Sequence, residues 1–196
     1  MNKTLITLLS ILALIVLTGL YFMGSYNSLV KLDEGVKQAW SQVENVYQRR
    51  LDLIPNLVET VKGYAKHEKD TFIAVTEARS KATGNISSDV INDPQKFQAF
   101  QQSQSALGSA LSRLLVVIEK YPDLKANENF LSLQAQLEGT ENRITVERGR
   151  YNEVAQAFNT QIRQFPSNFI ANMFGFSSKE YFKADKEATT APKVMF

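Results

Sequence analysis

One histidine and no cysteine limit the chemistry that this chain could perform. A di-iron site in a helical bundle needs Glu-x-x-His on two helices, but the residue three positions before His67 is Tyr64. The zinc-peptidase pattern fails as well, because Thr71 stands where the second histidine is required. Without cysteine the chain has no thiolate nucleophile, no disulfide and no Cys-based metal site. We therefore predict no catalytic residue, no metal and no cofactor, and we interpret His67 as a solvated residue near a helix break.

Two charged residues occupy positions where the helical pattern requires apolar ones. They are Arg50 and Glu147, which fall on different helices, and a buried charge is costly unless it is paired. One interpretation makes them part of a ligand or proton-relay site, with Asn142 as a neighbouring polar group. The simpler interpretation is a charge pair, or side chains reaching solvent at an edge, that fixes the helix register. An enclosed pocket around these groups would favour the first interpretation.

The overall charge argues against nucleic acid as a partner. The formal net charge is only +2, and the basic residues are too sparse to form a stripe along one face. The nine glycines are scattered singly, so no phosphate-cradling loop is present. With 196 residues, 44% hydrophobic and 21% charged, the chain has the composition of one globular domain, with or without an anchor. This composition excludes wholesale disorder.

The elements that must position these residues are helices. Apolar side chains recur at spacings of three and four, which is typical of helices that bury one face. Similar series run over residues 97–118 and 130–165, and no stretch of comparable length alternates with period two. The fold class that we predict is therefore all-α. The first series is apolar at eight of its nine positions, which are Leu29, Leu32, Val36, Ala39, Val43, Val46, Arg50, Leu53 and Leu57.

The helix ends predict an antiparallel up-and-down four-helix bundle with long helices over residues 26–166. Asp93 followed by Pro94 is typical of an N-cap and first helical residue, after a loop over residues 84–92. One helix over residues 26–83 would be about 85 Å long, against about 60 Å for the last helix over 125–165. A break between Gly63 and Asp70 makes the lengths match, and three helices with a long stalk are the alternative. Pro55 removes one helix hydrogen bond and predicts a kink in the first helix.

Residues 1–25 have the composition of a membrane anchor. The apolar block from Leu5 to Met23 contains no charge and, at ~1.5 Å per residue, is about 28 Å long, enough to cross a bilayer core. A cleaved signal peptide needs small residues at the −3 and −1 positions of the cut, and the candidate positions lack them. We predict an uncleaved single-pass helix with the N-terminus inside and the body outside.

The C-terminal part of the chain is rich in phenylalanine. The last 32 residues carry six of the twelve phenylalanines, whereas a disordered tail would be poor in aromatic residues. We predict a short aromatic-rich helical segment over 167–182 that packs on the bundle, with the membrane or a partner as alternatives, and a mobile tail over 183–196. Val194 and Phe196 end the chain in a pattern that a strand-augmenting domain with a carboxylate pocket accepts.

Several blocks occur in one order along nearly the whole chain, at residues 26–30, 49–58, 61–65, 119–125, 141–144, 150–152 and 174–176. With these blocks the sequence resembles the LemA family of bacterial membrane proteins. The resemblance implies one membrane span and an antiparallel helical domain of four-helix type, and it supplies no catalytic residue. The structural or interaction candidates are Arg50, Pro55, Asn56, Glu119, Asn142, Glu147, Tyr151, Asn152, Val194 and Phe196.

Together these observations predict a non-enzymatic, membrane-anchored helical scaffold or interaction module of the bacterial cell envelope, in the inner membrane. The expected partners are the membrane, other envelope proteins and a second copy of the chain. The alternatives are an enzyme or ligand-binding protein that uses polar groups inside the bundle, or an accessory subunit of a membrane peptidase or quality-control system. A magnetosome-associated branch of the family indicates roles in membrane organisation.

Overall fold

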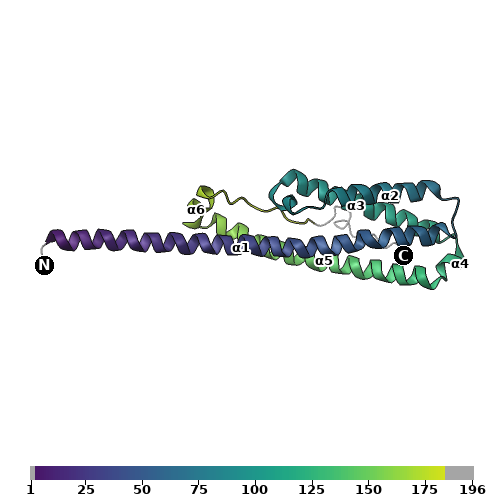
Figure 1. The fold of residues 1–196 in the computed structure, drawn as a ribbon, viewed down its shortest axis with the longest axis horizontal. Helices are drawn as coiled ribbons and strands as arrows, with labels where there is room; N and C mark the ends of the chain where they lie inside the picture. Colours follow the sequence, from purple (N-terminus) through teal and green to yellow (C-terminus); the bar gives the residue numbers. More distant parts are fainter. Residues whose placement is uncertain (1–2, 184–196) are drawn as a thin grey trace, which may run out of the picture.

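The computed structural model describes residues 3–183, and every regular element in that range is helical. This confirms the predicted all-α class. Figure 1 shows one very long helix whose N-terminal part projects beyond a helical body. The elements are α1 (Lys3–Lys62), α2 (Lys69–Gly84), the 3₁₀ helix η1 (Ser88–Asn92), α3 (Pro94–Ile118), α4 (Pro122–Lys125), α5 (Glu128–Arg163) and α6 (Ser167–Met173).

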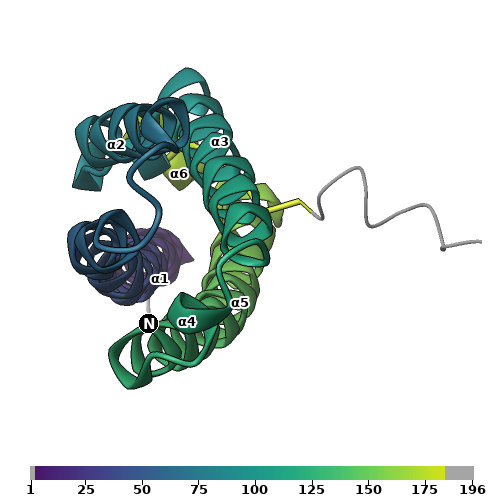
Figure 2. The ribbon, with the colours of Figure 1, turned by 90° about the vertical axis from the view of Figure 1, so that its right-hand side faces the viewer.

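Four of these helices form an antiparallel bundle. α1 and α5 run side by side along much of the body, while α2 and α3 form a second antiparallel pair that lies against them (Figure 1). Seen along its length, the body has α2, α3 and α5 arranged in a curve around α1 (Figure 2). The predicted anchor and the first bundle helix are therefore one continuous helix of 60 residues.

The predicted helix boundaries agree with the structure at two places. α1 ends at Lys62 and α2 begins at Lys69, as the expected break between Gly63 and Asp70 requires. At α3 the Asp93 carboxylate accepts hydrogen bonds from the backbone N–H groups of Gln95 and Lys96, at 2.8 and 3.2 Å. This is an N-cap, which satisfies backbone donors that have no partner within the helix.

Three boundaries differ from expectation. The last helix begins at Glu128 rather than residue 125, because Asn127 is extended and its side chain caps the helix by accepting from the N–H of Phe130. The expected loop over 84–92 contains η1, which buries Val90 and Ile91. The helix expected over the aromatic segment ends at Met173, and residues 176–183 have no regular secondary structure.

The predicted apolar face of the first helix is confirmed, since all nine of its positions between 29 and 57 are buried or half-buried. Pro55 lies inside α1, which continues as a helix past it. The core of the described residues has two large parts and a small third one formed by Leu29, Ile170 and Ala171. Mostly aliphatic residues fill the end near the α1–α2 turn, whereas aromatic rings dominate the middle of the body. The aromatic part contains Trp40, Tyr47, Phe97, Phe100, Tyr151, Phe158 and Phe182.

Candidate functional site

The N-terminal part of α1 is exposed and apolar. From Leu5 to Met23 every residue is exposed, and no part of the apolar window is buried inside the body. The hydroxyl groups of Thr7, Ser10 and Thr18 each donate to the carbonyl four residues earlier, at 2.8–2.9 Å. Internal hydrogen bonding of this kind is what a lipid environment requires. By length and composition, α1 is the one helix among the described residues that could cross a membrane.

α6 lies where the apolar part of α1 ends. The Ser25 and Ser167 hydroxyl oxygens are 3.2 Å apart, and the rings of Tyr26 and Phe174 are 4.6 Å apart between centroids. One face of α6 is buried, with Ile170 against Leu29 of α1. The opposite face is exposed. We give the name apolar foot to the exposed apolar side chains on α6 and at its two ends, which are Phe165, Phe169, Met173 and Phe174.

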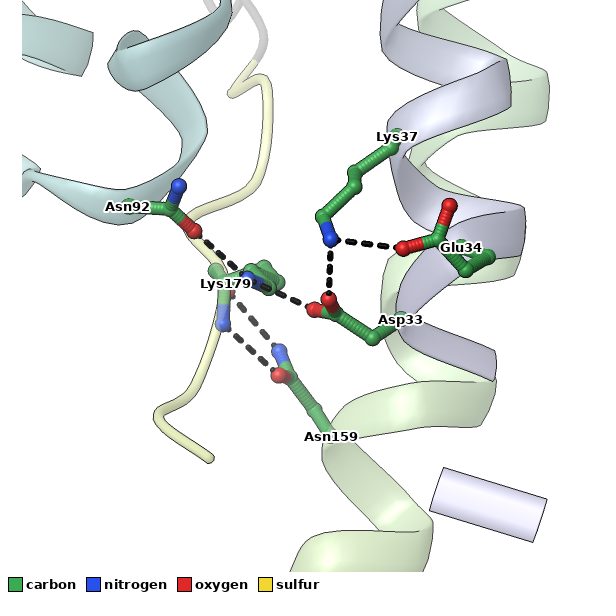
Figure 3. A network of polar contacts seen from close by, with 6 residues as sticks. All are labelled: Asp33, Glu34, Lys37, Asn92, Asn159 and Lys179. Carbon is green, nitrogen blue, oxygen red and sulfur yellow. Dashed lines mark hydrogen bonds and ion pairs between the residues drawn. The ribbon is translucent and has the colours of Figure 1, made fainter. Parts of the chain in front are cut away.

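Residues 176–183, here called the strap, run back along α5 and are held by two asparagines. The Asn159 amide donates to the carbonyl of Lys179 and accepts from its N–H, both at 2.8 Å (Figure 3). Asn152 binds the backbone of Phe182 in the same way, both bonds at 2.9 Å. Two helix turns span about 10.5 Å and three extended residues about 10 Å, so the spacings match. The asparagines therefore fix the strap in register with α5.

The side chain of Lys179 is buried in a polar network that joins the strap to two helices. Its Nζ lies 2.9 Å from the Asp33 carboxylate of α1 and donates to Asn92 of η1 at 2.7 Å (Figure 3). Burial alone would raise the pKa of Asp33, but hydrogen bonds and charge from Lys179 and Lys37 outweigh it and hold the pKa below its usual value. The carboxylate is thus the favoured form in the folded chain.

Phe182 closes the aromatic core. Its ring packs against Trp40, Phe97, Phe100 and Tyr151, with centroids 5.1–6.3 Å away. On its outer side the guanidinium of Arg148 lies 4.8 Å from the ring centroid and donates to the carbonyl of Lys183 at 2.9 Å. The strap therefore ends on the body at a defined point.

A cavity of about 430 Å³ opens beside Phe182, between α1, α3 and α5. Its lining includes the buried Arg50, whose Nη1 lies 3.4 Å from the exposed carboxylate of Glu141. Both amide atoms of Gln104 are buried without a hydrogen-bond partner among the described residues. The guanidinium packs on α3 at Gly108, where an added Cβ would lie 3.4 Å from Arg50 Nη2. A buried cation and an unpaired amide are suited to bind a polar, anionic group.

The structure does not bring the predicted site residues into one place. Arg50 is buried as expected, but Glu147 pairs with Arg150 at 3.0 Å, and the acidic neighbour of Arg50 is Glu141. Asn142 and Glu147 line a separate surface groove. Tyr151 and Asn152 belong to the strap region, where burial raises the pKa of Tyr151. The remaining candidates lie elsewhere. Pro55 and Asn56 are exposed on α1, and the Glu119 carboxylate pairs with Lys125 at 2.6 Å. Val194 and Phe196 fall outside the described residues.

Sequence reasoning missed Asp33, Gln104, Glu141, Asn159 and Lys179. One signal was available, because Asn152 and Asn159 are seven residues apart and so share a helix face. Nothing in the sequence indicated that a non-helical strap would lie against that face.

The sequence is similar to several known bacterial proteins. The chain is 28% identical over 186 residues to magnetosome protein MamQ 2 of Paramagnetospirillum magneticum, covering 86% of this chain and 68% of that protein. It is 26% identical over 165 residues to protein LemA of Metamycoplasma hominis, covering 84% and 72%. The model of the LemA family matches residues 39–196, which include the strap, both asparagines and the body from residue 39 onward. The chain therefore belongs to the LemA family.

Proposed function

We propose that this protein is a non-enzymatic scaffold of the bacterial cell envelope, anchored in the inner membrane by α1 with its body outside the cytoplasm. The observation that carries this proposal is the continuity of α1, which is a single helix from the exposed apolar segment into the core of the body. A helix without a linker transmits position and orientation, so the body stands at a fixed place relative to the bilayer.

The strap supports the same proposal. Through Asn152, Asn159 and Lys179 it attaches the chain to the body as far as Lys183. Our proposal is that the residues after Lys183, including Val194 and Phe196, bind other envelope proteins or a second copy of the chain. Relatives named as magnetosome proteins are compatible with a role in organising a membrane.

Crosslinking in intact cells, followed by identification of the attached proteins, tests the scaffold function. We expect defined envelope partners for the full chain and loss of at least one of them when residues 192–196 are deleted. A deletion in the segment directly after α2, residues 85–87, is not a suitable control because Ile86 packs on the core and Trp40 donates to the Ser87 carbonyl. The matched control is therefore replacement of residues 192–196 by five serines. A membrane peptidase among the partners would assign the accessory-subunit role, and an empty partner list for the full chain would contradict the scaffold.

Protease protection tests the orientation. Added to spheroplasts, protease should digest the body and leave the first residues protected, because the short N-terminal segment is proposed to be cytoplasmic. A fully protected body would reverse the proposed orientation.

The cavity at Arg50 favours a second function, the binding of a small anionic ligand. A buried guanidinium whose nearest carboxylate is exposed and 3.4 Å away retains capacity to bind an oxyanion, and the unpaired Gln104 amide adds a donor and an acceptor. Thermal melts with a panel of carboxylates and phosphates should show stabilisation that Arg50→Met abolishes. Arg49→Met is the matched control, because Arg49 is exposed and does not line this cavity. Equal stabilisation of both variants would contradict a ligand site at Arg50.

A further inference from the structure

The apolar foot exposes far more apolar surface than a water-facing helix should. Phe165 is 80% exposed, Phe169 60%, Met173 66% and Phe174 53%. Phe169 and Met173 are four residues apart and share one face of α6. Phe165 precedes the helix, but its ring packs on that of Phe169 with centroids 5.8 Å apart, so the three side chains form one exposed stripe. Clustered apolar exposure of this kind marks a surface that is covered by something else.

The stripe is presented by packing and is not a frayed end. The opposite side of α6 is fixed to the body, because Ile170 and Ala171 are buried against Leu29, and Ser167 contacts both Ser25 and Gln161 through its hydroxyl group. With that side fixed, the foot must point away from the body. Large exposed apolar residues in the body, such as Ile73, Val116 and Val146, are instead distributed over different helices.

The position of the foot identifies what covers it. α6 is held against α1 at Ser25 and Tyr26, directly after the exposed apolar segment that ends at Met23. If that segment crosses a bilayer, residues 21–26 lie at its surface, where aromatic side chains are favoured. Tyr21, Phe22 and Tyr26 of α1 then lie in the same layer as the foot.

We propose that the foot inserts into the interfacial layer of the bilayer that α1 spans, as a second membrane contact of the same molecule. This inference rests on the proposed membrane span of α1. Amphipathic segments with Phe and Leu on one face bind membranes in this way, with the apolar face buried to the depth of the acyl boundary. A single spanning helix can tilt and rotate freely, whereas a helix with a lateral foot has one preferred orientation. The foot therefore fixes the angle at which the body stands on the membrane.

Fluorescent labelling of single cysteines tests this directly, because the natural chain has no cysteine. Phe169→Cys, Leu14→Cys and Val116→Cys are prepared in the full chain, labelled with an environment-sensitive dye and reconstituted into phosphatidylcholine and phosphatidylglycerol vesicles. Lipids with quenchers on both the upper and the lower part of the acyl chain are then added, because residue 14 is at the centre of the proposed span and residue 169 near its surface. We expect at least twofold quenching at residues 14 and 169 and no quenching at 116, which is 67% exposed on α3.

The three probes separate failure of the inference from failure of the proposed anchor. Quenching at residue 14 without quenching at residue 169 would overturn the proposed membrane insertion of the foot and leave the span intact. If the unquenched probe at residue 169 is also blue-shifted, a protein contact covers this face instead of lipid. The absence of quenching at 14 overturns the span and with it the foot. A second variant pair removes the stripe itself: Phe165→Ser with Met173→Ser should reduce quenching at 169 at least twofold. Ile73→Ser with Val146→Ser is its control and should leave the quenching unchanged.

Discussion

Phe169 and Phe182 lie thirteen residues apart in the same C-terminal segment, yet Phe169 is 60% exposed and Phe182 only 7%. The ring of Phe182 contacts aromatic rings from three helices, while the foot ring of Phe169 has one ring contact, with Phe165 at 5.8 Å. The same residue type therefore serves as core in the middle of the body and as surface beside the anchor. Aromatic content alone does not distinguish these roles.

The difference arises from the polar groups around each ring. The strap backbone is paired with asparagine side chains on α5, so burying it beside Phe182 leaves few unsatisfied groups. Among the described residues no side chain clamps the backbone of α6 in this way, and the helix is held by its buried face, the hydroxyl of Ser167 and the ring contact of Phe174 with Tyr26. Burial of an extended segment depends on such partners, whereas a helix satisfies its own backbone and can face lipid.

The largest effect that we expect separates the two rings. Phe182→Ala should reduce the free energy of unfolding by about 3–5 kcal/mol, because it leaves a cavity among packed rings. Phe169→Ala should change it by no more than about 0.5 kcal/mol, as for an exposed site. Urea unfolding of the full chain in detergent micelles, followed by the fluorescence of Trp40, measures both. Equal losses in the two variants would remove the distinction between core and foot.

The asparagine clamp should have the next largest effect. Asn159→Ala leaves the N–H and carbonyl of Lys179 without their partner, and we expect a loss of about 2 kcal/mol from two unsatisfied groups. Asn142→Ala on the same helix is the control, since Asn142 is exposed, and should cost less than about 0.5 kcal/mol. Similar losses at both positions would mean that the strap is held by its apolar side chains alone.

A smaller, pH-dependent effect should come from Asp33. Its pKa is lowered in the folded chain, so ionised Asp33 contributes stability above the unfolded value of about 4, and this contribution is lost as the pH falls through the folded pKa. Melting temperatures measured from pH 7 down to pH 2.5 should fall less steeply below pH 4 for Asp33→Asn than for the natural chain. Parallel curves would show that Lys179 does not stabilise the carboxylate.

The smallest effect is expected at the edge of the cavity. Glu141→Gln should change the free energy of unfolding by less than about 0.5 kcal/mol, because the carboxylate is exposed and 3.4 Å from Arg50. Calorimetric melts can compare it with Glu138→Gln on the same exposed helix face. A loss above about 2 kcal/mol would indicate instead that Glu141 is the essential partner of a buried charge.

Helical spacing was sufficient to predict most of the fold. The apolar series beginning at Leu29, the break after Gly63 and the cap at Asp93 all follow from local sequence, and each is present in the structure. Local reasoning failed where the chain leaves helical geometry. It extended a helix through the aromatic segment because phenylalanine spacing does not show that backbone groups are paired with side chains far away in the sequence.

The polar sites were harder to predict for the same reason. Arg50 was identified correctly as a charge on an apolar face, but its neighbour depends on how α1 and α5 are aligned, and a shift of six residues separates Glu147 from Glu141. Lys179 resembled a solvated lysine in the sequence, because its burial depends on Asp33 and Asn92 from two distant elements.

Because α1 is unbroken, the number of residues between two points on it fixes their distance along the helix axis. Met23, the end of the apolar segment, and Ser25, which holds α6, are two residues apart, so the foot lies about 3 Å along the helix axis from that end. Each residue inserted between them would raise the body by ~1.5 Å and turn it by about 100° relative to the span. Four added residues would bring the body back to within about 40° of its original facing while lifting α6 by roughly 6 Å. If α1 spans the bilayer as proposed, the number of residues between Met23 and Ser25 sets the height of the body above the membrane.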